Sequence, residues 1–409
     1  MIEKFETGIS GFDELSFGGL PVGRTTLIAG DAGCGKTLFA LEALIRGAAA
    51  KGEPVLFVTF EETPRNLIDN ARSIGLDLEP LIASGALRID HVSAASVADD
   101  EVGSYSLEGL RLRVELGLRA SGATFLGIDT IEALFARFRD ERAVRAELAA
   151  LLTFLAGRGV TTLMTGERGG AAITRRRLEE YVSDCVLLLE QDVVDDVSTR
   201  RMQIVKYRGA RHGSNKYPFL IDAGGFWVMP MSSARLDHDV SFERASTGLD
   251  TLDEALGGGI RKGSTTLVSG GAGSGKTIVA ATMIEAACAR GETSVYASFE
   301  ESPKELARNA GAAGVSLDQH LANGRLSIQC ARPTLVGLER HLVELCNLVE
   351  ANDARFVVID PISSLTLAGD EVAAYRMVVR LIDFIKRRGA TAVLTMEGPR
   401  AETEFAEMR

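Results

Sequence analysis

Two short stretches, GDAGCGKT at residues 30–37 and GGAGSGKT at residues 270–277, decide how this chain folds. Each has the form G-x-x-x-x-G-K-T and lies between a β-branched apolar run and an Ala-rich segment without proline. A strand, this loop and a helix form a P-loop, whose backbone N–H groups wrap phosphate oxygens at a helix N-terminus. A glycine-rich turn without a ligand is the alternative, and two matches at equivalent places argue against it.

Within each loop the residue types predict separate tasks in binding ATP and Mg²⁺. Lys36 and Lys276 are expected to contact the β- and γ-phosphate oxygens, and Thr37 and Thr277 to ligate Mg²⁺. The glycines let the backbone approach the phosphates without a side-chain clash. The remaining expected ATP contacts in the two loops are Gly30, Ala32, Gly33, Cys34, Gly35, Leu38, Gly270, Ala272, Gly273, Ser274, Gly275 and Ile278.

The two loops belong to a duplication that runs along the chain. VTFEETP at 58–64 returns as ASFEESP at 297–303, and FLGIDT at 125–130 returns as FVVIDP at 356–361. The offset between the copies changes only from 240 at Gly30 and Gly270 to 230 at Glu167 and Glu397. A chain of 409 residues is longer than one hydrophobic core usually serves. We therefore expect two domains, 1–238 and 239–409.

Each copy has the pattern of an α/β domain. The runs TTLIAG, PVLFVTF, TFLGID and VTTLMTG are continuously apolar, which is typical of buried parallel strands. Residues 38–50 are predicted to be helical, and Thr63-Pro64 and Ser302-Pro303 are predicted helix starts, the latter with a capping box to Glu305. The fold class is therefore two tandem P-loop domains, each a mainly parallel sheet flanked by helices.

Acidic residues follow two strands of each copy. Asp129 and Asp360 each end an apolar strand, where a Walker B carboxylate would orient the Mg²⁺ shell; a helix-capping aspartate is the alternative. The pairs Glu61-Glu62 and Glu300-Glu301 directly follow another strand, where one carboxylate of each pair could act as general base for water. The alternative for these pairs is an exposed acidic turn.

Two cations lie on a strand-like run in the first copy. In RMQIVKYRGARH at 201–212, a strand would place Lys206 and Arg208 on one face, about 7 Å apart. If they met the γ-phosphate bound by a neighbouring subunit, they would form a trans arginine-finger pair. The residues alone fit an exposed basic edge strand equally well.

The composition limits the binding partners and the cellular compartment that we expect. The net charge of −11 argues against duplex DNA, although local basic patches occur at Arg137, Arg139, Arg142 and Arg145, and at residues 175–177. Five cysteines form no CxxC pair, so we expect buried thiols in a reducing compartment. No export segment or 18-residue apolar stretch occurs, which favours a cytoplasmic protein without a membrane span.

Together, the duplicated P-loops, the FEE motifs, NARSIGLDL at 70–78 and KYRGARH followed by YPF resemble the KaiC family of RecA-like ATPases over essentially the whole chain. The resemblance implies a homohexamer of stacked double rings with ATP at subunit interfaces. It implies catalytic roles for Glu61 and Glu62, and implies that Lys206, Arg208 and His212 reach the neighbour's ATP. Clock or signalling proteins are the implied further partners.

The second copy reaches Arg409 where the first has reached about Glu179. We therefore expect the second domain to be incomplete, without final strands, a K-x-R-G pair or the segment where KaiC relatives carry a phosphorylated Ser-Thr pair. Hydrolysis is then expected mainly in the first domain of a slow ATPase of a timing system. A serine/threonine autokinase and a DNA-dependent RecA-like ATPase are the alternative functions.

Overall fold

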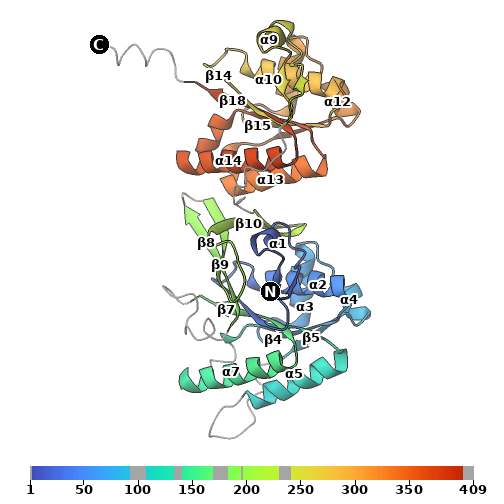
Figure 1. Ribbon diagram of the computed structural model, residues 1–409, viewed down its shortest axis with the longest axis vertical. Coiled ribbons are helices and arrows are strands. Elements are labelled where there is room, and N and C mark those ends of the chain that lie inside the picture. The colour runs from blue at the N-terminus through green and yellow to red at the C-terminus, as the bar shows by residue number, and fades with distance from the viewer. Residues whose placement is uncertain are drawn as a thin grey trace, which may run out of the picture. The chain divides into compact units, whose positions relative to one another are not determined.

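The computed structural model describes residues 2–92, 107–132, 141–168, 183–194, 197–229 and 241–398 (Figure 1). The chain divides into two compact units, Met1–Pro230 and Met231–Arg409. This boundary lies slightly before the expected one at residues 238 and 239, within the stretch 230–240 outside the described residues.

The first unit alternates strands and helices around its P-loop. Its first elements are β1 (Lys4–Phe5), α1 (Phe12–Leu15), β2 (Leu20–Pro21), β3 (Thr25–Gly30), α2 (Lys36–Lys51) and β4 (Val55–Thr59). There follow α3 (Pro64–Ser73), α4 (Glu79–Ala83), β5 (Leu87–His91), α5 (Glu108–Ser121), β6 (Phe125–Asp129), α7 (Glu141–Gly157) and β7 (Thr161–Glu167). The last strands are β8 (Cys185–Val194), β9 (Val197–Tyr207), β10 (Lys216–Asp222) and β11 (Gly225–Val228).

Strands β1 and β2 form a small separate sheet, and the other described strands of this unit form one large sheet in the order β11-β10-β9-β8-β3-β7-β6-β4-β5. Strands β5, β4, β6, β7, β3 and β8 pair in parallel, and β9, β10 and β11 continue the sheet in antiparallel pairs. Strand β3 lies between β7 and β8. The loop that follows β3 therefore begins in the middle of the sheet, at the carboxyl edge where open α/β sheets bind ligands.

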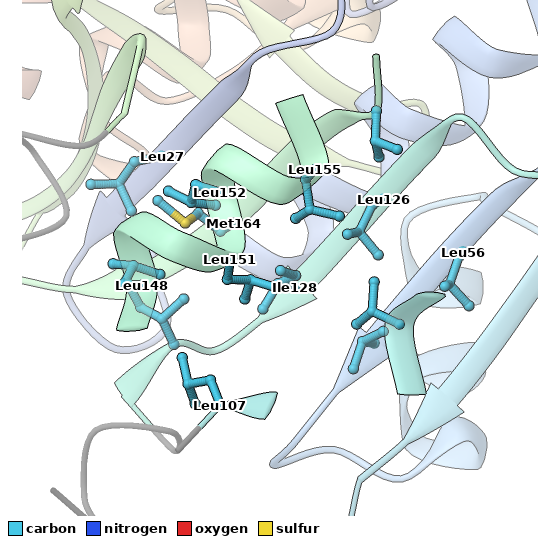
Figure 2. Packing of buried hydrophobic residues seen from close by; sticks show 14 of the residues in the cluster. Leu27, Leu56, Leu107, Leu126, Ile128, Leu148, Leu151, Leu152, Leu155 and Met164 are labelled. Atoms are coloured by element: carbon cyan, nitrogen blue, oxygen red, sulfur yellow. The ribbon is translucent and has the colours of Figure 1, made fainter. Parts of the chain in front are cut away.

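Helices cover both faces of this sheet, which explains why its parallel strands are continuously apolar. In Figure 1, α5 and α7 lie along one face and α2 and α3 along the other. On α7, Leu148, Leu151, Leu152 and Leu155 repeat at helical spacing, and Figure 2 shows them packed over side chains of the sheet such as Ile128. This buried layer keeps the strand ends, and so the candidate site, in a fixed arrangement.

The second unit repeats the pattern in its described residues. It begins with β12 (Arg244–Ala245), α9 (Asp250–Ala255), β13 (Ile260–Arg261), β14 (Thr265–Gly270), α10 (Lys276–Ala289) and β15 (Ser294–Ser298). There follow α11 (Pro303–Ala312), α12 (Asp318–Ala322), β16 (Leu326–Cys330), the 3₁₀ turn η1 (Pro333–Leu335) and α13 (Leu338–Ala351). It continues with β17 (Phe356–Asp360), η2 (Ile362–Ala368), α14 (Glu371–Arg387) and β18 (Thr391–Glu397).

Its parallel sheet has the order β14-β18-β17-β15-β16 among the described residues. The P-loop strand β14 is an edge strand there, whereas β3 is paired on both sides. Leu267 of β14 is 51% exposed, and Leu27 at the equivalent position of β3 is fully buried. The prediction of two parallel α/β domains is confirmed, but the surroundings of their P-loop strands differ.

Local sequence signals agree with the elements that form. Helix α2 begins at Lys36, two residues before the expected start, and α3 and α11 begin at the predicted prolines. Thr63 accepts a hydrogen bond from the Asn66 N–H, and Ser302 with Glu305 completes the predicted capping box. Within the described residues, none of the helices combines the length and apolarity that a membrane span needs.

The structure answers the expectation about the cysteines, but it describes only part of the candidate basic patches. Cys34, Cys185, Cys288 and Cys346 are buried free thiols, but Cys330 is only half-buried, contrary to expectation. Arg145 is exposed on α7. Arg137, Arg139 and residues 175–177 lie outside the described residues, as does the side chain of Arg142.

Candidate nucleotide and metal sites

The first P-loop has a backbone that requires its glycines. Gly33 and Gly35 have φ angles of 77° and 99°, in the left-handed region that favours glycine. A Cβ atom on Gly35 would lie 2.4 Å from Cδ1 of Ile221 and 2.9 Å from Cζ of Phe226. The loop can therefore turn from β3 into α2 under β10 and β11 only without a side chain here.

This loop fits an anionic phosphate chain. The first turn of α2 has no capping side chain and no acidic residue, so its N–H groups remain available to an anion. Lys36 is 8% exposed, and its Nζ donates to the backbone carbonyl of Asp31 at 2.8 Å. A buried ammonium satisfied only by a loop carbonyl is ready to exchange that acceptor for a phosphate oxygen.

The second P-loop repeats this arrangement. Gly273 and Gly275 have φ angles of 76° and 89°, and α10 begins at Lys276 without a capping side chain. Lys276 Nζ donates to the carbonyls of Gly270 at 2.8 Å and Gly271 at 2.9 Å. This loop is more exposed than the first, because its described surroundings contain no counterpart of β10 and β11.

The other predicted loop residues fall into two groups. Cys34 is buried, and burial raises the pKa of its thiol, so this side chain is a neutral packing group. Ala32, Ala272 and Ser274 are exposed on the loops, while Leu38 and Ile278 are half-buried on the first turns of α2 and α10. The structure thus brings all the predicted loop residues to the ends of β3 and β14.

In the first unit, the Walker B residue meets the P-loop threonine. Asp129 is buried at the end of β6 and accepts hydrogen bonds from Thr37 Oγ1 at 3.0 and 3.1 Å and from Thr165 Oγ1. Burial raises the pKa of the Asp129 carboxyl, despite the stabilising donors, and Glu62 and Glu61 add to this rise. A hydroxyl and a buried carboxylate in contact are hard oxygen ligands of the kind that Mg²⁺ prefers.

In the second unit the corresponding carboxylate has different partners. Asp360 accepts hydrogen bonds from Thr395 Oγ1 and, at 2.7 Å, from the hydroxyl of Tyr296 on β15. Among the described residues, Thr277 makes no hydrogen bond to Asp360. Burial raises the pKa of the Tyr296 phenol well above its ordinary value, and the negative charge of Asp360 adds to the rise, so the hydroxyl stays a donor. Tyr296 was absent from the sequence prediction; its only signal was that Phe57 occupies the same place in the first copy.

Both glutamate pairs are held by donors at the strand ends. In the first unit, Thr130 Oγ1 donates to Glu61 at 3.2 Å and Asn70 Nδ2 donates to Glu62 at 3.0 Å. The strand end that carries Asp129 therefore contacts the glutamate pair through Thr130, the residue that follows Asp129.

The second pair is held in the same way. Ser364 Oγ donates to Glu300 at 2.8 Å, and Asn309 Nδ2 donates to Glu301 at 2.9 Å. The asparagines were missed as site residues, although the repeated Asn-Ala of α3 and α11 was a signal for them. Ser364 has no equivalent signal, because it lies in η2 rather than directly after Asp360.

The predicted trans residues lie near the end of β9. A bulge opposite Val186 and Leu187 leaves Val205 out of register, so Tyr207 is buried between the half-buried Lys206 and the exposed Arg208. Lys206 Nζ donates to the Ser183 carbonyl at 2.7 Å, and Arg208 Nη1 lies 4.0 Å from Asp184 Oδ1.

Tyr207 holds this segment on the unit. Its hydroxyl donates to the Gly19 carbonyl at 3.0 Å, and its ring stacks on His212 with centroids 6.3 Å apart. His212 Nδ1 lies 3.0 Å from the Gly213 carbonyl oxygen. The two cations and His212 therefore share one edge of the first unit.

Two sheets with parallel strands, each carrying a P-loop, a buried strand-end aspartate and a glutamate pair, define a tandem P-loop ATPase. The family model for the KaiC ATPase matches residues 5–233 and 245–409. The chain is 45% identical to circadian clock protein KaiC2 of Synechocystis sp. over 393 residues, 96% of this chain and 69% of that relative. It is 36% identical to the circadian clock oscillator protein KaiC of Synechococcus elongatus over 396 residues, 96% of this chain and 76% of that relative. The chain belongs to the KaiC family.

Proposed function

We propose that this protein binds ATP with Mg²⁺ at both P-loops, at interfaces between subunits of a homohexameric double ring, and hydrolyses it slowly. The observation that carries the proposal is the repetition of one arrangement in both units. In each unit, a lysine at a helix N-terminus, a buried aspartate and two held glutamates follow the carboxyl ends of parallel strands of one sheet. A glycine-rich turn with a purely structural role would not need the same lysine, aspartate and glutamates around it in both units.

The chain's own residues have distinct tasks in this proposal. Lys36 and Lys276, with the first-turn N–H groups of α2 and α10, hold the phosphates of ATP. Thr37 with Asp129, and Thr277 with Asp360, hold Mg²⁺, which when bound offsets negative charge on the phosphate oxygens.

The remaining residues act on water and across the subunit interface. Glu61 with Glu62, and Glu300 with Glu301, orient the attacking water and accept its proton. Lys206 and Arg208, with His212 beside them, face the ATP of the neighbouring subunit and stabilise charge in the transition state.

We further propose that the nucleotide state sets ring assembly and partner binding, as part of a clock or another timing system in the cytoplasm. Support comes from the relatives, which carry the names circadian clock protein and circadian clock oscillator protein. Clock or signalling proteins are then the partners, and nucleic acid is not, because the chain carries a net charge of −11.

Light scattering after size exclusion, with and without Mg²⁺ and ATP, tests the assembly. We expect a hexamer with ATP and smaller species without it, because nucleotide bound between subunits stabilises the ring by mass action. The double variant Lys36→Ala with Lys276→Ala should stay small in both conditions. A monomer in both conditions for the wild type would contradict the interface sites.

Replacing Asn70 by Asp tests how the first glutamate pair is held. The change keeps the size of the side chain, removes the donor to Glu62 and adds a negative charge beside it. A lost hydrogen bond to a charged group costs about 1.5–3 kcal/mol, so kcat should fall about tenfold or more.

The matched control is Asn309→Asp, which makes the same change at Glu301 in the second unit. It should affect total turnover less, because we place most hydrolysis in the first unit. An Asn70→Asp variant with wild-type kcat would show that Asn70 has no role in holding the glutamate pair for hydrolysis.

A further inference from the structure

The two sites differ at one fully buried position next to the Walker B aspartate. Phe57 on β4 and Tyr296 on β15 are both 0% exposed, and they occupy the middle of equivalent strands. Each strand pairs in parallel with the strand that ends in the aspartate, β6 in the first unit and β17 in the second. At this position the two copies differ by one hydroxyl group, although the facing residue is Gly127 in the first unit and Val358 in the second.

That hydroxyl changes which donors the carboxylate receives. Asp129 accepts from Thr37 and Thr165, and Asp360 accepts from Tyr296 and Thr395. Thr165 and Thr395 are equivalent residues, at an offset of 230. The difference is thus confined to one donor: the P-loop threonine in the first site and a phenol from the sheet in the second.

The identity of this donor matters for a magnesium site. A threonine hydroxyl that gives its lone pair to Mg²⁺ must direct its hydrogen elsewhere, and the Walker B carboxylate is the acceptor. Thr37 already donates to Asp129 at 3.0 and 3.1 Å. For Thr277 to do the same, it must share Asp360 with the Tyr296 hydroxyl, which also draws negative charge away from the cation.

We propose that Tyr296 is a positioning residue that makes the second site bind Mg²⁺ more weakly than the first, because its hydroxyl donates to Oδ2 of Asp360, the oxygen that in Asp129 accepts from Thr37 among the described residues. This inference rests on the proposed binding of ATP with Mg²⁺ at both P-loops. It predicts two sites in one chain that fill at different Mg²⁺ concentrations. The first site is prearranged for the ion, and the second must rearrange to accept it.

Tyr296→Phe is the sharpest test, because it gives the second site the side chain of the first. The full chain is made in a Lys36→Ala background so that only the second P-loop binds, and a fluorescent ATP analogue is titrated with Mg²⁺. We expect the Mg²⁺ concentration for half-maximal binding to fall about tenfold, the size of effect typical for partners of metal ligands. Binding of Mn²⁺, followed by electron paramagnetic resonance with the same nucleotide, should tighten in parallel.

The reciprocal variant supplies the matched control. Phe57→Tyr in a Lys276→Ala background should raise the Mg²⁺ requirement of the first site. The thermal midpoint without nucleotide shows whether Tyr296→Phe leaves the fold intact, which we expect because the two aromatic side chains fill the same space.

The outcomes separate this inference from the proposed function. An unchanged or raised Mg²⁺ requirement in Tyr296→Phe, with Mg²⁺-dependent binding otherwise present, would overturn the role of Tyr296 alone. No Mg²⁺-dependent nucleotide binding at either P-loop would overturn the proposed function and, with it, this inference.

Discussion

Replacing Glu61 and Glu62 together by Gln is expected to lower ATP hydrolysis at the first site by about 10²- to 10⁴-fold, the usual contribution of general base catalysis, and so to remove most of the steady-state hydrolysis of the whole chain. Glutamine keeps the shape and can still accept the hydrogen bonds from Thr130 and Asn70, but it cannot take a proton from water. Nucleotide binding should remain, because Lys36 and the first turn of α2 are untouched. Phosphate release and binding of a fluorescent ATP analogue measure the two effects separately.

The comparison with Glu300→Gln plus Glu301→Gln decides where hydrolysis takes place. We expect this second variant to keep most of the turnover, because Thr37 is already in contact with Asp129 while Asp360 is engaged by Tyr296. The trans candidates Lys206 and Arg208 also belong to the first unit. Turnover that survives the first double change and is lost with the second would place hydrolysis in the second unit instead.

The sequence was sufficient to predict the elements that carry the site. Gly33 and Gly35, with Gly273 and Gly275, stand where the backbone has a left-handed φ, and the continuously apolar runs of the first copy became buried parallel strands. Both signals lie in residues adjacent in sequence. A glycine pattern indicates the backbone geometry of a turn, and an unbroken apolar run indicates a strand buried on two faces. The duplication gave these predictions further support, because each of them could be made independently in both copies.

Contacts between side chains of distant segments were not predictable in this way. The hydrogen bond from Tyr296 to Asp360 depends on the pairing of β15 with β17, and nothing near Tyr296 in the sequence announces it. Ser364 replaces Thr130 as the donor to the first glutamate from a different position along the chain. Such pairs form when packing brings the groups within hydrogen-bond distance, and sequence spacing alone does not encode that distance.

Strand alternation was also an incomplete guide on β9. It predicted a common face for Lys206 and Arg208, and the bulge at Val205 is what allows Tyr207 to be buried between them. A bulge shifts the alternation by one residue, so it redirects every later side chain of the strand. Without it, the regular alternation from Met202 and Ile204 would have turned Lys206 toward the buried face.

Replacing both Lys206 and Arg208 by Ala should lower hydrolysis by about 10³-fold or more, the lower end of the effect of arginine fingers. The two cations act on the phosphate charge that develops in the transition state, so ATP affinity should change much less than kcat. Lys206 donates to the Ser183 carbonyl and Arg208 lies near Asp184, and both of these partners belong to the first unit itself. Arg211→Ala is a matched control, because it removes a nearby cation of the same loop that is outside the proposed pair.

Mixing two inactive variants distinguishes action across an interface from action within one subunit. Subunits with Glu61→Gln and Glu62→Gln retain the two cations, and subunits with Lys206→Ala and Arg208→Ala retain the glutamates. In mixed rings some interfaces combine an intact glutamate pair with intact cations from the neighbour, so part of the wild-type phosphate release should return as the ratio approaches equality. Cations that serve only their own P-loop would leave every mixture as inactive as its components, because no single subunit would contain both sets of groups.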